Sequence, residues 1–95
     1  MKRELMGREE IEAGLKTLDG WEIKGERLSK RMKFENFAES LKFVNQVGEI
    51  AEAADHHPDI TFGWGYAELN TTTHDLGGIT GVDFALATKI DEIGC

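Results

Sequence analysis

The chain has 95 residues, of which 40% are hydrophobic and 31% charged, and a formal net charge of −7. This length suffices for one domain with a modest core, and no apolar run approaches the roughly 20 residues of a membrane span. We therefore expect a single domain over residues 1–95 without a membrane segment. The N-terminus lacks the apolar stretch of a signal peptide, and the single cysteine is the terminal Cys95, so a reducing cytoplasm is the expected location.

The negative charge is concentrated in the second half of the chain. Residues 1–48 carry 10 Lys and Arg against 9 Asp and Glu, whereas residues 49–95 carry only Lys89 against 9 acids. A surface that binds nucleic acid needs clustered Lys and Arg along the phosphate backbone. The second half is therefore not expected to bind nucleic acid.

Apolar spacing and turn residues predict four elements in the first half of the chain. They are a helix at 8–18, a hairpin with strands at 21–24 and 27–34, and a helix of about 18 residues ending at 55. Gly25 lies in the hairpin turn, and Asn36 is a favourable N-cap for the long helix. The apolar side chains of that helix fill about half of its circumference, which requires a broad surface such as a sheet. They are Phe37, Leu41, Phe43, Val44, Val47, Ile50, Ala51 and Ala54.

The second half predicts two further strands and a last helix. Strands are expected at 60–64, where apolar residues alternate with Thr and Gly, and at 66–73, which is rich in Thr. A Gly-Gly loop follows, and Thr80-Gly-Val-Asp83 has the spacing of a capping box for a helix to about residue 93. The order α-β-β-α-β-β-α predicts an α+β fold of two layers, a four-stranded antiparallel sheet with helices on one face. The other face would lack a cover, which favours a homo-oligomer.

All three histidines lie within 19 positions of the acidic half. Two follow each other in the segment Glu52-Ala-Ala-Asp-His-His-Pro58, and His74 comes after the last strand. Because histidine gains and loses a proton near neutral pH, this grouping indicates proton-transfer chemistry on a small substrate.

The spacing of this segment also resembles a known family signature. The pattern Glu-x3-His-His-Pro-x5-Trp-x9-His-x8-Asp, from Glu52 to Asp83, is similar to that of the pterin-4a-carbinolamine dehydratases. The resemblance extends from about Gly20 to the last helix. It implies dehydration of 4a-hydroxytetrahydropterin to quinonoid dihydropterin, in the recycling of tetrahydropterin cofactor, without a metal or organic cofactor. It also implies a homodimer or homotetramer.

The resemblance assigns a role to seven side chains. Those implied to be catalytic are His56, His57 and His74, and those implied to bind the pterin are Glu52, Asp55, Trp64 and Asp83. Many members have arginine where this chain has Val82, and tyrosine where it has Trp64.

Most of these residues also have a purely structural interpretation. The two adjacent histidines follow a helix C-terminus, where the helix dipole favours a cation, and they could serve only to cap it. Glu52 could be a solvated helical partner of His56, and Asp83 could simply stabilise the start of the last helix. Asp55 has no such explanation, because a carboxylate at a helix C-terminus opposes the dipole. Trp64 is interpreted as an aromatic wall of the pocket or sheet.

A metal site is the main chemical alternative for three histidines. Zinc ligands usually lie at spacings that let both reach one ion, whereas adjacent histidines diverge, so no metal site is expected. Two other classes of function stay open: a non-catalytic interaction module that dimerises with a transcription factor, as some animal members do, and a pterin-binding protein without turnover.

Overall fold

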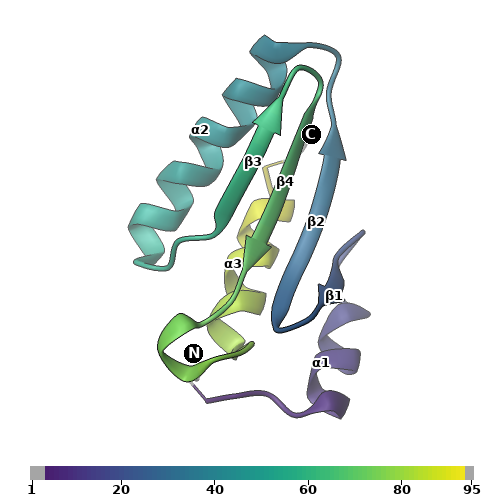
Figure 1. Ribbon diagram of the computed structural model, residues 1–95, viewed down its shortest axis with the longest axis vertical. Helices are drawn as coiled ribbons and strands as arrows, with labels where there is room; N and C mark the ends of the chain where they lie inside the picture. Colours follow the sequence, from purple (N-terminus) through teal and green to yellow (C-terminus); the bar gives the residue numbers. More distant parts are fainter. Residues whose placement is uncertain (1–3, 94–95) are drawn as a thin grey trace.

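The computed structural model describes residues 4–93 and has the predicted order of elements (Figure 1). Cys95 lies outside this range. The elements are α1 (Arg8–Leu15), β1 (Glu22–Lys24), β2 (Arg27–Lys33), α2 (Phe37–Ala54), β3 (Asp59–Gly63), β4 (Tyr66–Thr71), the 3-10 helix η1 (His74–Leu76) and α3 (Gly81–Asp91). The first helix ends three residues earlier than predicted, and η1 replaces part of the predicted loop.

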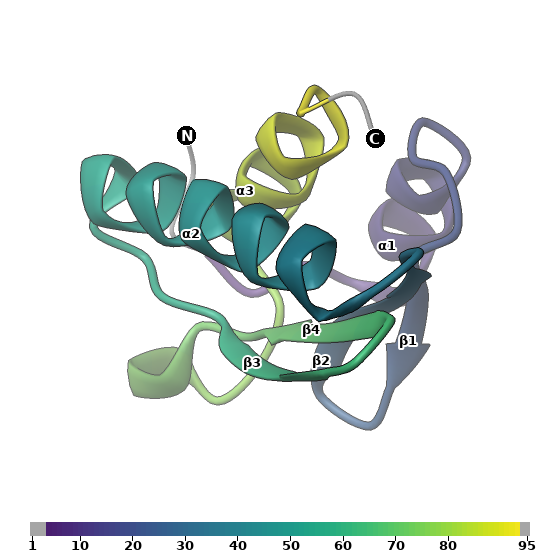
Figure 2. The ribbon, with the colours of Figure 1, turned by 90° about the horizontal axis from the view of Figure 1, so that it is seen from above.

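The four strands form one antiparallel sheet in the order β1-β2-β4-β3. All three α-helices lie on the same face of this sheet (Figure 2), as predicted. Helix α2 packs against β3, β4 and α3, and the core lies between these helices and the inner face of the sheet. Its largest fully buried apolar side chains are Phe43, Leu28, Leu69, Leu86, Ile90 and Val47. No helix within residues 4–93 is long and apolar enough to span a membrane.

Helix α2 begins as predicted but buries a narrower face. Asn36 caps it by accepting a hydrogen bond from the Glu39 amide at 2.9 Å. The polar Ser40 is fully buried and donates to the Gly63 carbonyl at 2.6 Å, which ties the helix to the end of β3. Phe37 and Leu41, in contrast, are 46% and 39% exposed. The predicted apolar stripe was therefore too wide, because one layer of strands covers only part of the helix circumference.

The uncovered face of the sheet is hydrophilic. Arg27 of β2 pairs with Asp59 of β3 at 2.6 Å, and Arg31 lies 3.8 Å from Glu68 and over the ring of Tyr66. Charged side chains of this kind remain favourably solvated without a cover. The side chains described on this face therefore offer no apolar surface to drive self-association, and the oligomeric state stays a prediction.

Candidate active site

The first two histidines are positioned by the C-terminus of α2. Asp55 adopts the left-handed conformation (φ 51°), and within residues 4–93 no other residue except glycine has a positive φ. The His56 amide then donates back to the Ala51 carbonyl at 3.2 Å, which closes the helix in the manner of a Schellman ending. Aspartate tolerates this conformation better than most residues do. The left-handed helix ending therefore supplies the structural reason for Asp55 that the sequence did not reveal.

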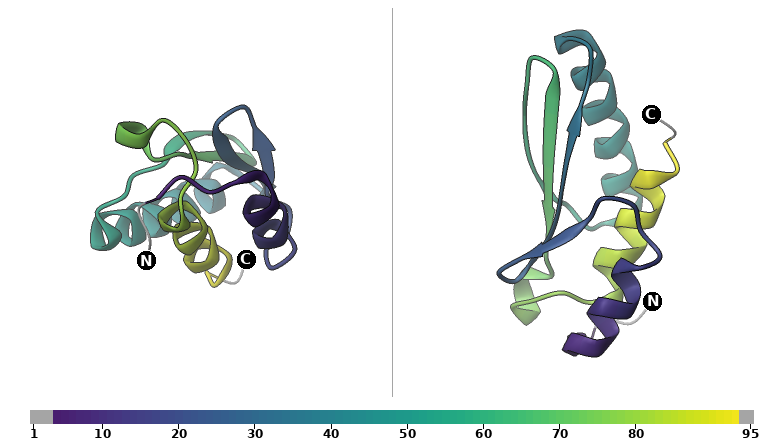
Figure 3. Two further views of the ribbon diagram at one scale, coloured as in Figure 1. Left: turned by 90° about the horizontal axis from the view of Figure 1, so that it is seen from below. Right: turned by 90° about the vertical axis from the view of Figure 1, so that its right-hand side faces the viewer.

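The third histidine reaches the same end of the sheet from β4. Asp59 at the start of β3 is opposite Asn70 near the end of β4, so the segments before β3 and after β4 are neighbours. His74 begins η1, and the chain then turns back into the N-terminus of α3 (Figure 3, right). Three elements, α2, η1 and α3, thus converge at one end of the sheet.

Asp83 of α3 lies at the centre of this convergence and is completely buried. Its Oδ1 is 2.6 Å from His56 Nε2 and accepts a hydrogen bond from Thr71 Oγ1, also at 2.6 Å. Its Oδ2 accepts from Thr73 Oγ1 and from the Thr80 amide, both at 2.9 Å. Each carboxylate oxygen therefore has two partners. The predicted capping box is present, but Asp83 does more than cap the helix, because it also holds His56.

The positions of the protons in this network follow from its donors and acceptors. A carboxylate only accepts hydrogen bonds, so His56 donates its Nε2 proton to Asp83. The single hydroxyl proton of Thr73 is used on Asp83, so Thr80 Oγ1 donates to Thr73 Oγ1 at 2.9 Å. The neutral form of His56 thus carries its proton on Nε2 and has a lone pair on Nδ1. Among the described residues, Nδ1 of His56 has no hydrogen-bond partner.

The other candidate residues are more exposed. His57 Nε2 makes a hydrogen bond to Glu52 on the surface, so Glu52 pairs with His57 and not with His56. His74 is also exposed. Trp64 lies in the turn between β3 and β4, at the opposite end of the hairpin, and is 72% exposed. Within one chain, the structure therefore does not bring Trp64 to the histidines.

A cavity of about 670 Å³ opens beside His56. One wall is the face of α3 that carries Val82, Ala85, Leu86 and Lys89 at helical spacing. The other walls come from the end of α2 and from η1. The lining residues are Ala54, Asp55, His56, Asp75, Val82, Ala85, Leu86 and Lys89. Sequence reasoning missed Asp75 and Lys89 as pocket residues. The helical spacing of Lys89 from Val82 could have revealed it, whereas nothing in the sequence placed Asp75 there.

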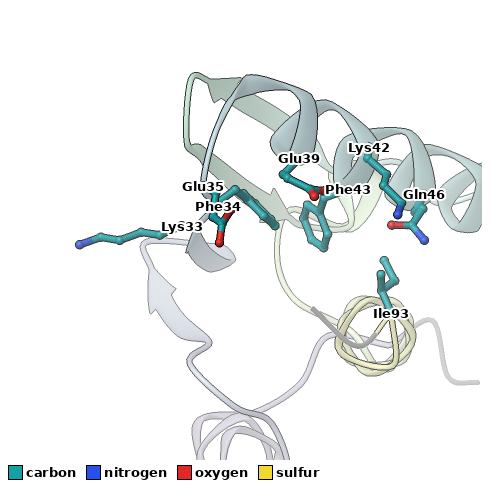
Figure 4. Close-up of a pocket in the computed structure, with 8 residues that line it drawn as sticks. All are labelled: Lys33, Phe34, Glu35, Glu39, Lys42, Phe43, Gln46 and Ile93. Carbon is teal, nitrogen blue, oxygen red and sulfur yellow. The ribbon is translucent and has the colours of Figure 1, made fainter.

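A second cavity, of about 600 Å³, lies away from the histidines (Figure 4). It is bounded by the end of β2, the first half of α2 and Ile93, the second residue after α3. Its lining residues are Lys33, Phe34, Glu35, Glu39, Lys42, Phe43, Gln46 and Ile93. It contains no histidine and has an equal number of lysines and glutamates. Within residues 4–93, no group of three His, Cys, Asp or Glu side chains is arranged to hold a metal ion in either cavity or elsewhere.

The fold and this site together define a class of protein. Its members are two-layer α+β domains in which a histidine at the edge of a cavity bonds to a buried carboxylate. The chain belongs to the pterin 4 alpha carbinolamine dehydratase family, whose model matches residues 4–93.

Similar proteins agree with this family. A protein of Rubrobacter xylanophilus, named "Putative pterin-4-alpha-carbinolamine dehydratase", is 49% identical over 86 residues, which are 90% of this chain and 80% of that protein. A protein of Halorhodospira halophila with the same name is 44% identical over 94% of this chain and 84% of its own length.

Two solved structures share the fold. The transcriptional coactivator/pterin dehydratase of Brucella melitensis superposes with a TM-score of 0.91 at 29% identity, over 97% of this chain and all of that one. A pterin dehydratase-like protein identified as a RuBisCO assembly factor in the alpha-carboxysome has a TM-score of 0.68 at 24% identity, over 79% of this chain and 89% of its own. The expected fold class is confirmed.

Proposed function

We propose that this protein dehydrates 4a-hydroxytetrahydropterin to quinonoid dihydropterin in the cytoplasm, and so serves the recycling of tetrahydropterin cofactor. The observation that carries the proposal is the bond between His56 and the buried Asp83 at the edge of a cavity large enough for a bicyclic ligand. Membership of the dehydratase family supplies the substrate class.

The reaction needs one proton removed and one delivered. The N5–H bond of the pterin breaks, its electrons form the N5=C4a double bond, and the C4a–O bond breaks as the hydroxyl leaves with an added proton as water. In this mechanism, Nδ1 of His56 accepts the N5 proton, because Asp83 already holds the proton on Nε2. General acid–base catalysis of this kind contributes roughly 10²–10⁴-fold to the rate.

The exposed histidines are the proposed source of the proton that leaves with the hydroxyl. Both His57, which Glu52 orients, and His74 lie at the same end of the sheet as His56. Asp55 lines the cavity and is the proposed acceptor for N–H groups of the pterin pyrimidine. Asp83 cannot contact substrate directly, since it is completely buried, so its proposed role is to position His56.

A carbinolamine dehydration assay with purified protein tests this function, and a chelator is included because the proposed mechanism uses no metal. We expect dehydration in the presence of the protein to be much faster than the uncatalysed reaction. The chelator should leave this rate unchanged. Binding of pterin without turnover would identify a pterin-binding protein instead. If the protein shows neither pterin binding nor turnover, the non-catalytic interaction module is the function that remains.

Replacing Asp55 with glycine is expected to separate stability from activity. Glycine adopts the left-handed conformation freely, so Asp55→Gly should raise the free energy of unfolding by about 1 kcal/mol. Loss of the carboxylate from the cavity should lower kcat/KM roughly tenfold. Denaturant titration and the dehydration assay measure the two effects. Asp55→Asn, which tolerates the same backbone, is the matched control and should lose activity without the gain in stability.

We propose that the protein forms a homodimer or homotetramer. Three large apolar side chains are exposed near the hairpin tip and the start of α2, namely Phe37, Leu41 and Trp64. Covering them would remove apolar surface from water, and β3 is an unpaired edge of the sheet. Light scattering at micromolar concentration should report at least a dimer, and Leu41→Glu should shift the protein toward the monomer. A monomeric wild-type protein would contradict the proposal.

A further inference from the structure

Thr71 contacts the carboxylate oxygen of Asp83 that His56 also uses, and, like Thr73, it belongs neither to the capping box nor to the family signature. It is the last residue of β4, and its side chain points into the core, where it is 1% exposed. Its hydroxyl donates to Asp83 Oδ1 at 2.6 Å, the same oxygen and the same distance as for His56 Nε2. Two donors therefore share one carboxylate oxygen.

Sharing of this kind has an electrostatic consequence. A hydrogen bond from Thr71 draws electron density toward itself on Oδ1, so less negative charge is available to the proton on His56 Nε2. In a buried, poorly solvated site such effects are stronger than in water. The other oxygen, Oδ2, is fully used by Thr73 and Thr80, so the carboxylate cannot rotate to compensate.

We propose that Thr71 is a positioning residue for the reaction. Its hydroxyl joins Thr73 and Thr80 in holding the Asp83 carboxylate and limits the strength of the Asp83–His56 hydrogen bond. The Nδ1 lone pair of His56 thereby stays available for the reaction. The kinetic part of this inference rests on the proposed dehydratase function, whereas the part that concerns the hydrogen bond does not.

Thr71→Val is the test variant, because valine has nearly the same shape without the hydroxyl. Thr71→Ser keeps the hydroxyl and is the matched control, and Thr71→Cys provides a weaker donor if the valine variant does not fold. The other charged groups lining the His56 cavity are Asp55 from the end of α2, Asp75 from η1 and Lys89 from α3. They are the same in every variant, so the comparison isolates Thr71.

Two measurements are made on each variant. The first is the NMR resonance of the His56 Nε2 proton, which needs no turnover and should move downfield in Thr71→Val and stay unchanged in Thr71→Ser. The second is the pH profile of kcat/KM, whose acid limb should move to higher pH by roughly one unit in Thr71→Val alone. Thr71→Cys should lie between wild type and valine in both.

The two measurements separate failure of the inference from failure of the function. An unchanged proton resonance in Thr71→Val, or a His56 that carries its proton on Nδ1 in the wild type, would overturn the inference. A wild type without turnover would refute the dehydratase function, and the NMR comparison would still decide the role of Thr71. If the resonance moves and the pH profile of an active enzyme does not, Thr71 has no part in catalysis.

Discussion

Replacing His56 with alanine is expected to lower the turnover of carbinolamine dehydration by about 10²-fold or more, the usual contribution of a general acid or base. His56 is the histidine that both lines the cavity and bonds to the buried Asp83. Its imidazole is 13% exposed but lies outside the apolar core, so the substitution should lower stability through the lost bond to Asp83 and leave the fold in place. Circular dichroism should show an intact fold, and the dehydration assay measures the loss.

His74→Ala is the companion variant and is expected to lower turnover at least tenfold, with a smaller effect on stability because His74 is exposed. Comparison with His57→Ala then shows which exposed histidine delivers the proton to the leaving hydroxyl. Lys42→Ala, in the second cavity, should keep the wild-type rate. Wild-type turnover in His56→Ala would remove that residue from the mechanism, and a collapsed fold in the same variant would support a structural role for His56 instead.

The largest loss of stability is expected from Asp83→Ala. Its carboxylate binds four donors from three parts of the chain, the end of α2, the end of β4 and the start of α3. Removing one partner of a buried pair typically costs about 3–5 kcal/mol. Such a loss is a large share of the roughly 5–15 kcal/mol that stabilises a small domain. Denaturant titration should therefore show a much lower midpoint, and activity should be absent.

Asp83→Asn keeps the shape of the side chain and tests the same contact more gently. The amide nitrogen of the new asparagine cannot accept a hydrogen bond, so the donors that face it would lose their acceptor. Each unsatisfied group should lower the free energy of unfolding by roughly 1–3 kcal/mol. Asp59→Asn is the matched control, because it breaks an exposed ion pair with Arg27 and should cost less than about 1 kcal/mol. Equal stability losses at the two positions would contradict the central role of Asp83.

Local patterns predicted the order of the elements, because each needs only neighbouring residues. The caps at Asn36 and Thr80 are examples, since both act within one helical turn. The extent of burial was less predictable. Phe37 and Leu41 are apolar and correctly spaced, yet they are exposed because their burial depends on where the sheet ends.

The candidate site was predicted as a set of residues but not as a set of contacts. His56 and Asp83 are 27 positions apart, and only the tertiary fold shows that they bond to each other while Glu52 bonds to His57. Thr71 was predicted as part of a strand, and its contact to Asp83 depends on how α3 crosses the end of β4. Trp64 was grouped with the histidines by the resemblance to the family signature, whereas an antiparallel hairpin places its turn at the far end.

The central claim is that pterin binds in the cavity beside His56, and NMR titration with a stable dihydropterin tests it most directly. The two cavities differ in their residues, so the shifted backbone signals identify the site. We expect changes concentrated at residues 54–56 and 82–89, with little change at Lys42, Gln46 and Ile93. Changes confined to the second cavity, or no change at saturating ligand, would contradict the proposed site.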